Sequence, residues 1–205
     1  MKIAITGHTS GLGKYIYDAC VKNKHDVVGF SLTSGHDIDN KDVCYDIIDQ
    51  AKNMDMFINC AYGSVKDQYV KGANGQIELL KQILSAWGED KSKFILHIGS
   101  KYMYRNPQKI LPAKIYTLDK RHAHDIIQNS SSEAKVFNFI PGMFESSMSD
   151  MWPDVFTKSK MEHIGDTLCF YIENCKRMWP QEVVIDKTDL LHRPLEEVIK
   201  LGSTQ

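Results

Sequence analysis

Two residues in the second half of the chain have the types and spacing for acid–base chemistry. Tyr116 and Lys120 lie four positions apart, so both fall on one face of a helix and can approach each other. A free phenol has a pKa of about 10, and a neighbouring ammonium would lower that pKa toward neutrality. Tyr116 would then pass a proton to or from a substrate oxygen. The same spacing occurs by chance in many helices, so its meaning depends on what surrounds it.

A hydroxyl group stands where it would assist this tyrosine. The segment 94–98 is apolar, which predicts a buried strand, and Ser100 follows two residues after it. Ser100 would therefore sit at the carboxyl edge of a sheet, near the helix that carries Tyr116. There it would donate a hydrogen bond to a carbonyl oxygen and stabilise developing negative charge.

Glycines near the start of the chain predict a phosphate-binding turn. An apolar run over 3–5 predicts a buried strand, and it leads into the pattern TGxxxGxG over 6–13 before a helical pattern begins. Glycine lets backbone N–H groups approach a phosphate closely, and the helix N-terminus faces the anion with partial positive charge. This design is typical of a dinucleotide-binding loop. A tight turn without a ligand is the alternative.

These motifs need elements to position them, and apolar runs alternate with helical patterns along the chain. Strands are predicted at 2–6, 26–31, 55–59, 93–98, 135–140 and 182–186, with a weak one near 43–45. Helices are predicted at 12–23, 73–87, 112–129 and 161–177.

The alternation predicts an α/β fold, a Rossmann-type doubly wound parallel sheet of about seven strands with helices on both faces. The chain reads as one domain over 1–205. The irregular segments 101–112 and 143–160 follow strands, so they would lie at the ligand-binding edge as substrate loops. Ordinary surface loops are the alternative there.

In their order along the chain, the motifs resemble the short-chain dehydrogenase/reductase family. The matching segments are the loop Thr6–Gly13, the adenine-contacting pair Asp46-Ile47, Asn59-Cys60-Ala61-Tyr62-Gly63 for the family's Asn-Asn-Ala-Gly, the catalytic Ser100, Tyr116 and Lys120, and Pro141-Gly142 to Ser146 beside the nicotinamide. The resemblance implies hydride transfer between a nicotinamide cofactor and a carbonyl or alcohol carbon, with no metal.

The resemblance also assigns roles. Ser100 would hold the substrate oxygen, Tyr116 would exchange the proton, and Lys120 would lower the tyrosine pKa and bind the nicotinamide ribose. Asn74 is the nearest match to the family's fourth catalytic residue, an asparagine. Expected cofactor contacts are Gly7, His8, Thr9, Ser10, Gly11, Leu12, Gly13, Ser31, Asp46, Ile47, Asn59, Ala61, Tyr116, Lys120, Pro141, Gly142 and Ser146. Expected substrate contacts are Ser100, Tyr62, Tyr104, Met143, Phe144 and Trp152.

The chain also departs from the family pattern. Cys60 stands where the family has its second asparagine, and Tyr62 displaces the glycine of the same motif. Asn74 lies at the start of its predicted helix rather than within it. The chain is shorter than typical members, and the shortened segments are those that normally recognise the substrate. The substrate class is therefore left open.

The second predicted strand bears on the choice of cofactor. An acidic residue at its end would bind the ribose of NAD and repel a 2′-phosphate. The segment instead ends in Ser31, Thr33 and Ser34, whose hydroxyls would donate to that phosphate, with His8 nearby. The segment has no arginine to pair with the phosphate, which counts against NADP. Because the acidic residue is absent and the hydroxyls are present, we expect NADP in preference to NAD.

The composition of the chain narrows the classes of partner that it can bind. The chain has 25 basic and 26 acidic residues and a net charge of −1, which argues against a nucleic-acid or membrane surface. No apolar stretch approaches the roughly 20 residues of a membrane span, and the first strand begins too early for a signal peptide. Five cysteines without paired metal spacing favour a reducing, cytoplasmic setting. The resemblance implies a small-molecule substrate and a homodimer or homotetramer.

Two other functions stay open. A redox sensor would bind NADP(H) without catalysis, although it would not need Ser100, Tyr116 and Lys120 together. A sugar-nucleotide epimerase or dehydratase shares the tyrosine–lysine chemistry but usually carries a large C-terminal substrate domain. Only a short segment follows Gly142 here.

Overall fold

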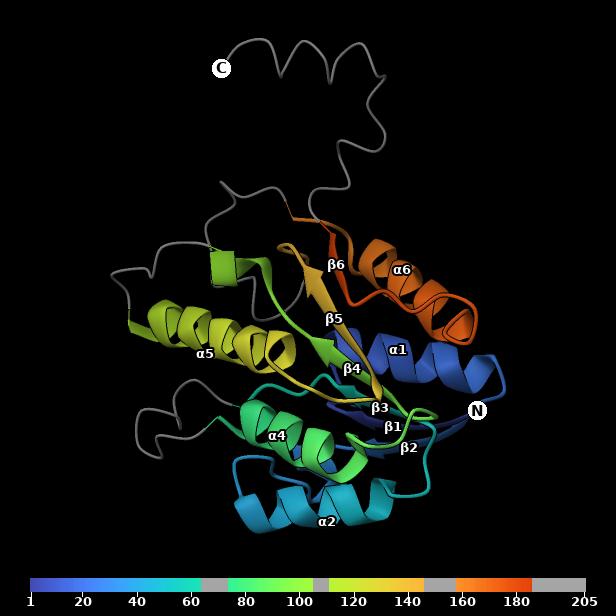
Figure 1. Ribbon diagram of the computed structural model, residues 1–205. Coiled ribbons are helices and arrows are strands. Elements are labelled where there is room, and N and C mark those ends of the chain that lie inside the picture. The colour runs from blue at the N-terminus through green and yellow to red at the C-terminus, as the bar shows by residue number, and fades with distance from the viewer. Residues whose placement is uncertain (64–73, 105–110, 146–157, 186–205) are drawn as a thin grey trace.

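The computed structural model describes residues 1–63, 74–104, 111–145 and 158–185. Its centre is a parallel sheet of six strands in the order β2-β1-β3-β4-β5-β6 (Figure 1). The strands are β1 (Lys2–Thr6), β2 (Asp26–Phe30), β3 (Met56–Asn59), β4 (Phe94–Ile98), β5 (Lys135–Pro141) and β6 (Glu182–Ile185).

Helices cover both faces of this sheet (Figure 1). One face carries α1 (Gly11–Lys22) and α6 (Met161–Glu173), and the other carries α2 (Lys41–Ala51), α4 (Gly75–Trp87) and α5 (Leu111–Gln128). Short 3-10 helices, η1 (Leu32–Ser34) and η2 (Lys101–Tyr104), follow β2 and β4. Among the described helices, none is long and apolar enough to cross a membrane.

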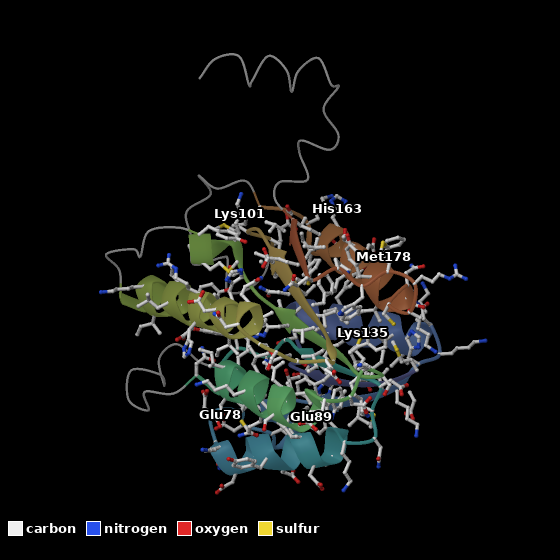
Figure 2. The ribbon with its side chains drawn as sticks, viewed as in Figure 1. Glu78, Glu89, Lys101, Lys135, His163 and Met178 are labelled. Atoms are coloured by element: carbon white, nitrogen blue, oxygen red, sulfur yellow. The ribbon has the colours of Figure 1, made fainter. Side chains whose placement is uncertain are left out.

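Two cores result, because successive side chains of a strand point to opposite faces. Ile3 and Ile5 of β1 join the cluster beneath α1 and α6, whereas Ala4 joins the cluster beneath α2 and α4. Charged side chains lie on the outside, as Glu89 and Lys135 do in Figure 2. Lys120 differs from these because only 3% of it is exposed.

The predicted fold class is confirmed, and the strand count of six is near the predicted seven. The weak strand expected near 43–45 is wrong, since these residues lie inside α2. Asn40 caps that helix by accepting the N–H of Asp42 at 3.0 Å. Cys44, Ile47 and Ala51 then face the core at helical spacing.

The sheet order also marks a ligand-binding place. β1 lies between β2 and β3, so the chain continues from β1 to a strand on one side and then crosses to a strand on the other side. In open α/β sheets, ligands bind beyond the carboxyl ends of the strands at such a reversal. The glycine loop after β1 and the segment after β3 both start there.

Candidate active site

The glycine loop has the geometry of a phosphate cradle. Gly7 and Gly11 have φ of +78° and +53°, a region that side chains disfavour. A Cβ at Gly13 would lie 2.2 Å from the Gly7 carbonyl oxygen, so glycine is needed for α1 to pack on the loop. Ser10 precedes α1 without a side-chain cap, and the first turn contains no acidic residue. The first N–H groups of α1 therefore suit an anion.

The segment after β3 is held against this loop by one hydroxyl. Thr6 Oγ1 accepts the backbone N–H groups of Cys60 and Ala61, each at 3.0 Å. Ala61 comes so close that a Cβ at Gly7 would lie 3.1 Å from its Cα. Burial raises the pKa of Cys60 to about 12, so this residue remains a thiol near neutral pH. Cys60 is a small, partly buried residue that packs against the core, and a neutral thiol is a poor nucleophile.

Ser100, Tyr116 and Lys120 converge beyond the carboxyl end of β4. Ser100 is 6% exposed and its side chain hydrogen-bonds that of Tyr116. Lys120 reaches down from α5, where its Nζ donates to the Ile98 carbonyl oxygen at 2.8 Å. The same Nζ lies 5.5 Å from the centre of the Tyr116 ring. The three residues expected from the spacing are thus brought together.

Electrostatics at this trio differ from the expectation. Burial raises the pKa of Tyr116 to about 12, although the hydrogen bond with Ser100 acts to lower it. Burial lowers the pKa of Lys120 to about 7. The predicted lowering of the tyrosine pKa by an ammonium is therefore wrong for this structure, because loss of water contact outweighs it at both residues. Near neutral pH, Tyr116 is a phenol that can donate a proton.

Aromatic rings enclose Tyr116. The centre of the Tyr62 ring lies 4.9 Å away and that of Tyr102 lies 6.1 Å away, both edge to face. The Tyr62 hydroxyl donates to Asp119 Oδ2 at 2.8 Å, which fixes this ring beside the phenol. Tyr62 was expected in the substrate pocket and Tyr102 was not. The aromatic run directly after Ser100 was the available signal for Tyr102.

Asn74, expected as the fourth catalytic residue, caps α4 instead. Its Oδ1 accepts the N–H of Gln76 at 2.9 Å, and its Nδ2 donates to Asp119 Oδ2 at 2.7 Å. The amide oxygen thus caps the start of α4, and the amide nitrogen ties that start to α5. Gln76 is the residue of α4 that contacts Lys120, with 2.6 Å between Oε1 and Nζ. Sequence reasoning missed Gln76, because nothing local distinguishes it.

The side chains of four expected cofactor contacts are packed in the core or exposed on α2. Leu12 packs its side chain in the core, and Asn59 is fully buried with its Nδ2 donating to the Gln76 carbonyl oxygen at 2.8 Å. Asp46 is exposed on α2, and Ile47 beside it is fully buried. Asp46 and Ile47 lie within α2, away from the glycine loop. Leu12 lies in the first turn of α1 and Asn59 at the end of β3, and cofactor contact at these two stays a prediction.

A second Asp-hydrophobic pair lies nearer the expected place. Asp37 and Ile38 follow β2 and η1 at the carboxyl edge of the sheet. Ile38 is 7% exposed, and its carbonyl oxygen accepts the thiol of Cys44 at 3.0 Å. The pattern Asp-Ile occurs at three places in the sequence, at 37–38, 46–47 and 125–126, and only the position of α2 separates the first two.

Hydroxyl groups gather at the end of β2. Ser31 Oγ lies 3.0 Å from Thr33 Oγ1 and 3.1 Å from Ser34 Oγ. Thr33 in turn donates to Thr9 Oγ1 of the glycine loop at 3.3 Å. His8 of that loop carries a buried Nδ1 with no hydrogen-bond partner in the part of the chain that the structure describes. Together with the glycine cradle, these donors fit the phosphate groups of a dinucleotide cofactor.

The remaining expected contacts surround the end of β5. Pro141 is buried, and the Gly142 N–H donates to the Ile185 carbonyl oxygen at 2.7 Å. The Met143 carbonyl oxygen accepts the N–H of Ser159 at 2.9 Å, and Phe144 packs on the core beneath α1. Tyr104 is 54% exposed on η2. Ser146 and Trp152 lie outside the described residues, as do parts of both expected substrate loops.

Comparisons with known proteins agree with this fold. Residues 3–162 match the family described as the NAD dependent epimerase/dehydratase family. Comparison with curated protein sequences gives no match.

Solved structures share the fold at low identity. A short-chain dehydrogenase from Burkholderia cenocepacia J2315 in complex with NADP is 15% identical, with a TM-score of 0.62 over 100% of this chain and 93% of that one. The 3-ketoacyl-(acyl-carrier-protein) reductase from Brucella melitensis, complexed with NADH, is 14% identical, with a TM-score of 0.69 over 90% and 96%. The protein lin1944 from Listeria innocua is 15% identical, with a TM-score of 0.67 over 91% and 100%.

The family match spans most of the chain. The chain therefore belongs to the NAD dependent epimerase/dehydratase family.

Proposed function

We propose that this protein is an NAD(P)-dependent reductase of a small-molecule carbonyl group. The observation that carries the proposal is the Ser100–Tyr116 hydrogen bond with Lys120 beside it, beyond the strand ends that also present the glycine loop. A bound nicotinamide would supply the hydride to the carbonyl carbon.

The residues of the chain would handle the oxygen and its proton. Ser100 would hold the carbonyl oxygen by a hydrogen bond, which stabilises the negative charge that develops there. Tyr116 would transfer its hydroxyl proton to that oxygen and regain a proton afterwards. The raised pKa of Tyr116 supports the reductive direction, because the residue carries the proton that this direction consumes.

Positions around the trio suggest how the cofactor would lie. Backbone N–H groups of the loop from Gly7 to Gly13 would hold the pyrophosphate. Asp37-Ile38, rather than Asp46-Ile47, would contact the adenine, since the former pair lies at the carboxyl edge. The hydroxyls of Ser31 and Thr33 would donate to a 2′-phosphate, which favours NADP over NAD.

The family match supports a second candidate, because epimerases and dehydratases of sugar nucleotides use the same tyrosine–lysine chemistry. An epimerase returns its hydride to the substrate, so it would show no net oxidation of added NADPH. A non-catalytic sensor would bind the cofactor and also show no oxidation of NADPH.

A cytoplasmic location and a homodimer or homotetramer remain predictions.

Binding and turnover together test the proposal. Fluorescence titration with NADPH and NADH comes first, followed by NADPH oxidation across a panel of aldehydes and ketones. We expect Tyr116→Phe to abolish turnover and keep binding, because it removes only the proton donor. Tyr45→Phe, a change at an exposed tyrosine on α2, is the matched control. Binding without turnover on the whole panel would reject the reductase, and failure to bind either nucleotide would reject all three functions.

A further inference from the structure

Lys120 is a buried lysine with two direct acceptors. Its Nζ donates to Gln76 Oε1 at 2.6 Å and to the Ile98 carbonyl oxygen at 2.8 Å. Lys120 is 3% exposed and Gln76 is 1% exposed, so water does little to stabilise the ammonium. In such surroundings each acceptor matters more than it would at the surface.

The amide of Gln76 is held with its oxygen toward Lys120. Its Nε2 donates to the Asn59 carbonyl oxygen at 3.2 Å, which turns Oε1 the other way. In return, Asn59 Nδ2 donates to the Gln76 carbonyl oxygen at 2.8 Å. This reciprocal pair ties the end of β3 to the start of α4. Turning the amide over would break both bonds, because its NH₂ would then face the ammonium and its oxygen would face the Asn59 carbonyl oxygen.

We propose that Gln76 is a positioning residue for Lys120, which holds the lysine side chain beside Tyr116 and keeps it protonated. The consequence of this role for catalysis rests on the reductase proposed above. The effect of Gln76 on Lys120 depends only on the fold. Ile98 supplies a backbone oxygen that no side-chain change removes, so Gln76 is the adjustable half of the contact.

The other groups that face Lys120 leave this role to Gln76. Burial raises the pKa of the Cys60 thiol, following β3, and holds the pKa of His97 on β4 well below its usual range. Tyr116 on the same helix is a phenol, and the Lys120 ammonium lies 5.0 Å above the Tyr62 ring. Two neighbouring groups act to raise the lysine pKa, first Cys60 and then the Asp119 carboxylate.

That carboxylate is engaged by other donors. Asp119 Oδ2 accepts the Tyr62 hydroxyl at 2.8 Å and Asn74 Nδ2 at 2.7 Å. Its attraction for the lysine therefore acts without a direct bond among the contacts that the structure shows. Gln76 remains the side chain that meets the ammonium directly.

The test follows the titration of Lys120 by NMR of protein labelled with ¹³C at lysine Cε, with Lys120→Met identifying the resonance. Gln76→Met removes the acceptor at similar size, so the midpoint should fall by about one pH unit or more. Gln76→Glu adds negative charge at the same place, so the midpoint should rise. Gln82→Met, at a glutamine farther along α4, is the matched control and should leave it unchanged.

The same variants are assayed for NADPH oxidation against pH. The pH at which kcat/KM falls on the alkaline side should move with the NMR midpoint, down for Gln76→Met and up for Gln76→Glu. A residue that only supported folding would lower activity without moving this profile. Should Gln76→Met fail to fold, Gln76→Glu still tests the inference, because it retains an acceptor.

The outcomes separate the two proposals. Midpoints in both Gln76 variants that match the Gln82→Met control would overturn the role of Gln76. Midpoints that move as expected, in protein that oxidises no NADPH with any substrate, would retain that role and reject the reductase alone.

Discussion

His97 on β4 and Asn138 on β5 are register partners in the middle of the sheet, and both side chains are fully buried. Asn59 pairs with His97 on one side, and Glu182 pairs with Asn138 on the other, so polar residues cross four neighbouring strands in one row. The row lies beneath α4 and α5, because Asn59 meets Gln76 there and Glu182 meets His124. It runs from the neighbourhood of Lys120 to the partly exposed Glu182.

The buried histidine makes stability depend on pH. Burial, with a smaller effect of Lys120, holds the pKa of His97 well below 6.5. The unfolded chain takes up a proton near pH 6.5 that the folded chain does not, so this contribution is complete above 6.5 and is lost as pH falls. The loss would approach about 1.4 kcal/mol for each pH unit below that value.

Denaturant unfolding of wild type and His97→Gln at pH 7.5 and 5.5 measures this difference. We expect the stability of the wild type to fall more on acidification than that of the variant. His122→Gln, at an exposed histidine of α5, is the control. Equal losses in wild type and His97→Gln would show that His97 is protonated in the folded protein.

Asn138 should be replaceable by an apolar residue. Neither its Nδ2 nor its Oδ1 has a hydrogen-bond partner among the described residues, although the residue is 0% exposed. A buried polar group without a partner costs roughly 1–3 kcal/mol, and Asn138→Leu has similar volume. We expect the variant to be as stable as the wild type or more stable by about 1 kcal/mol, as measured by urea unfolding. A loss above about 1 kcal/mol would indicate a bridging water in the native protein.

The elements of this fold could be predicted because their pattern is local. The strand expected at 26–31 is β2 at Asp26–Phe30, and the helix expected at 73–87 is α4 at Gly75–Trp87. The helix α2 was missed although its signals were present, since Asn40 is a common N-cap and Cys44 and Ile47 have helical spacing. Its short apolar stretch was interpreted as a strand instead.

The site could be predicted only in part. Tyr116 and Lys120 share a helix, so their spacing alone places them together, and Ser100 follows from the end of a strand. Contact between Gln76 and Lys120 depends on how α4 packs against α5, which no local pattern contains. The predicted direction of the Tyr116 pKa shift is wrong for a related reason, because burial by neighbouring elements cannot be inferred from spacing.

The hydroxyls after β2 provide a test of cofactor preference. Thr33 is exposed on η1 and bonds Thr9 of the glycine loop. A carboxylate at this position would repel a 2′-phosphate by more than about 1 kcal/mol at close range and would accept from a ribose hydroxyl. We expect Thr33→Asp to raise the Kd of NADPH about tenfold or more and to leave the Kd of NADH unchanged or lower.

Fluorescence titration of both nucleotides gives these constants, and Thr33→Asn supplies the same shape without the charge. If Thr33→Asp weakens NADPH and NADH alike, the segment after β2 does not contact the 2′-phosphate. Unchanged affinity for NADPH would likewise contradict the proposed preference.

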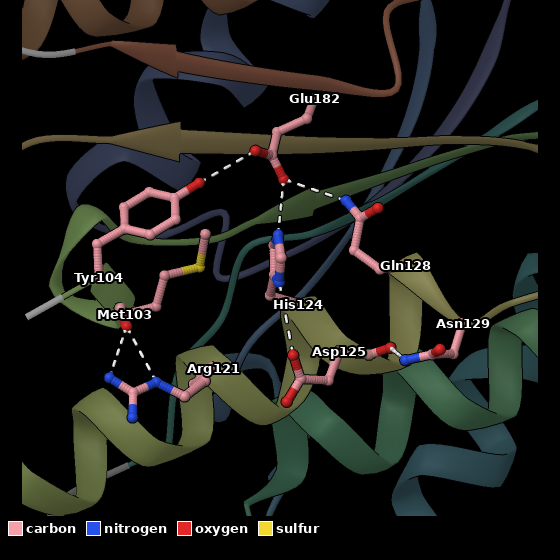
Figure 3. Close-up of polar contacts among 8 residues, drawn as sticks. All are labelled: Met103, Tyr104, Arg121, His124, Asp125, Gln128, Asn129 and Glu182. Carbon is pink, nitrogen blue, oxygen red and sulfur yellow. Dashed lines mark hydrogen bonds and ion pairs between the residues drawn. The ribbon is translucent and has the colours of Figure 1, made fainter.

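Glu182 joins three elements near the end of the polar row (Figure 3). Its Oε1 accepts the Tyr104 hydroxyl of η2 at 3.0 Å, and its Oε2 lies 3.0 Å from His124 Nε2 and 3.4 Å from Gln128 Nε2 on α5. A single carboxylate on β6 thereby ties η2, which directly follows Ser100, to the sheet. Its side chain is 25% exposed, so each contact is worth less than a buried one.

A double-mutant cycle of Tyr104→Phe and Glu182→Ala measures that tie. We expect Glu182→Ala to lower the free energy of unfolding by about 1 kcal/mol and the pair to couple by about 0.5–1 kcal/mol. Because the tie holds η2 near the trio, Glu182→Ala should also speed amide hydrogen exchange over Lys101–Tyr104 and leave exchange in α2 unchanged. Additive effects of the two changes would show that the hydroxyl and the carboxylate do not interact in solution, and η2 would then depend on the Met103 carbonyl contact with Arg121 instead.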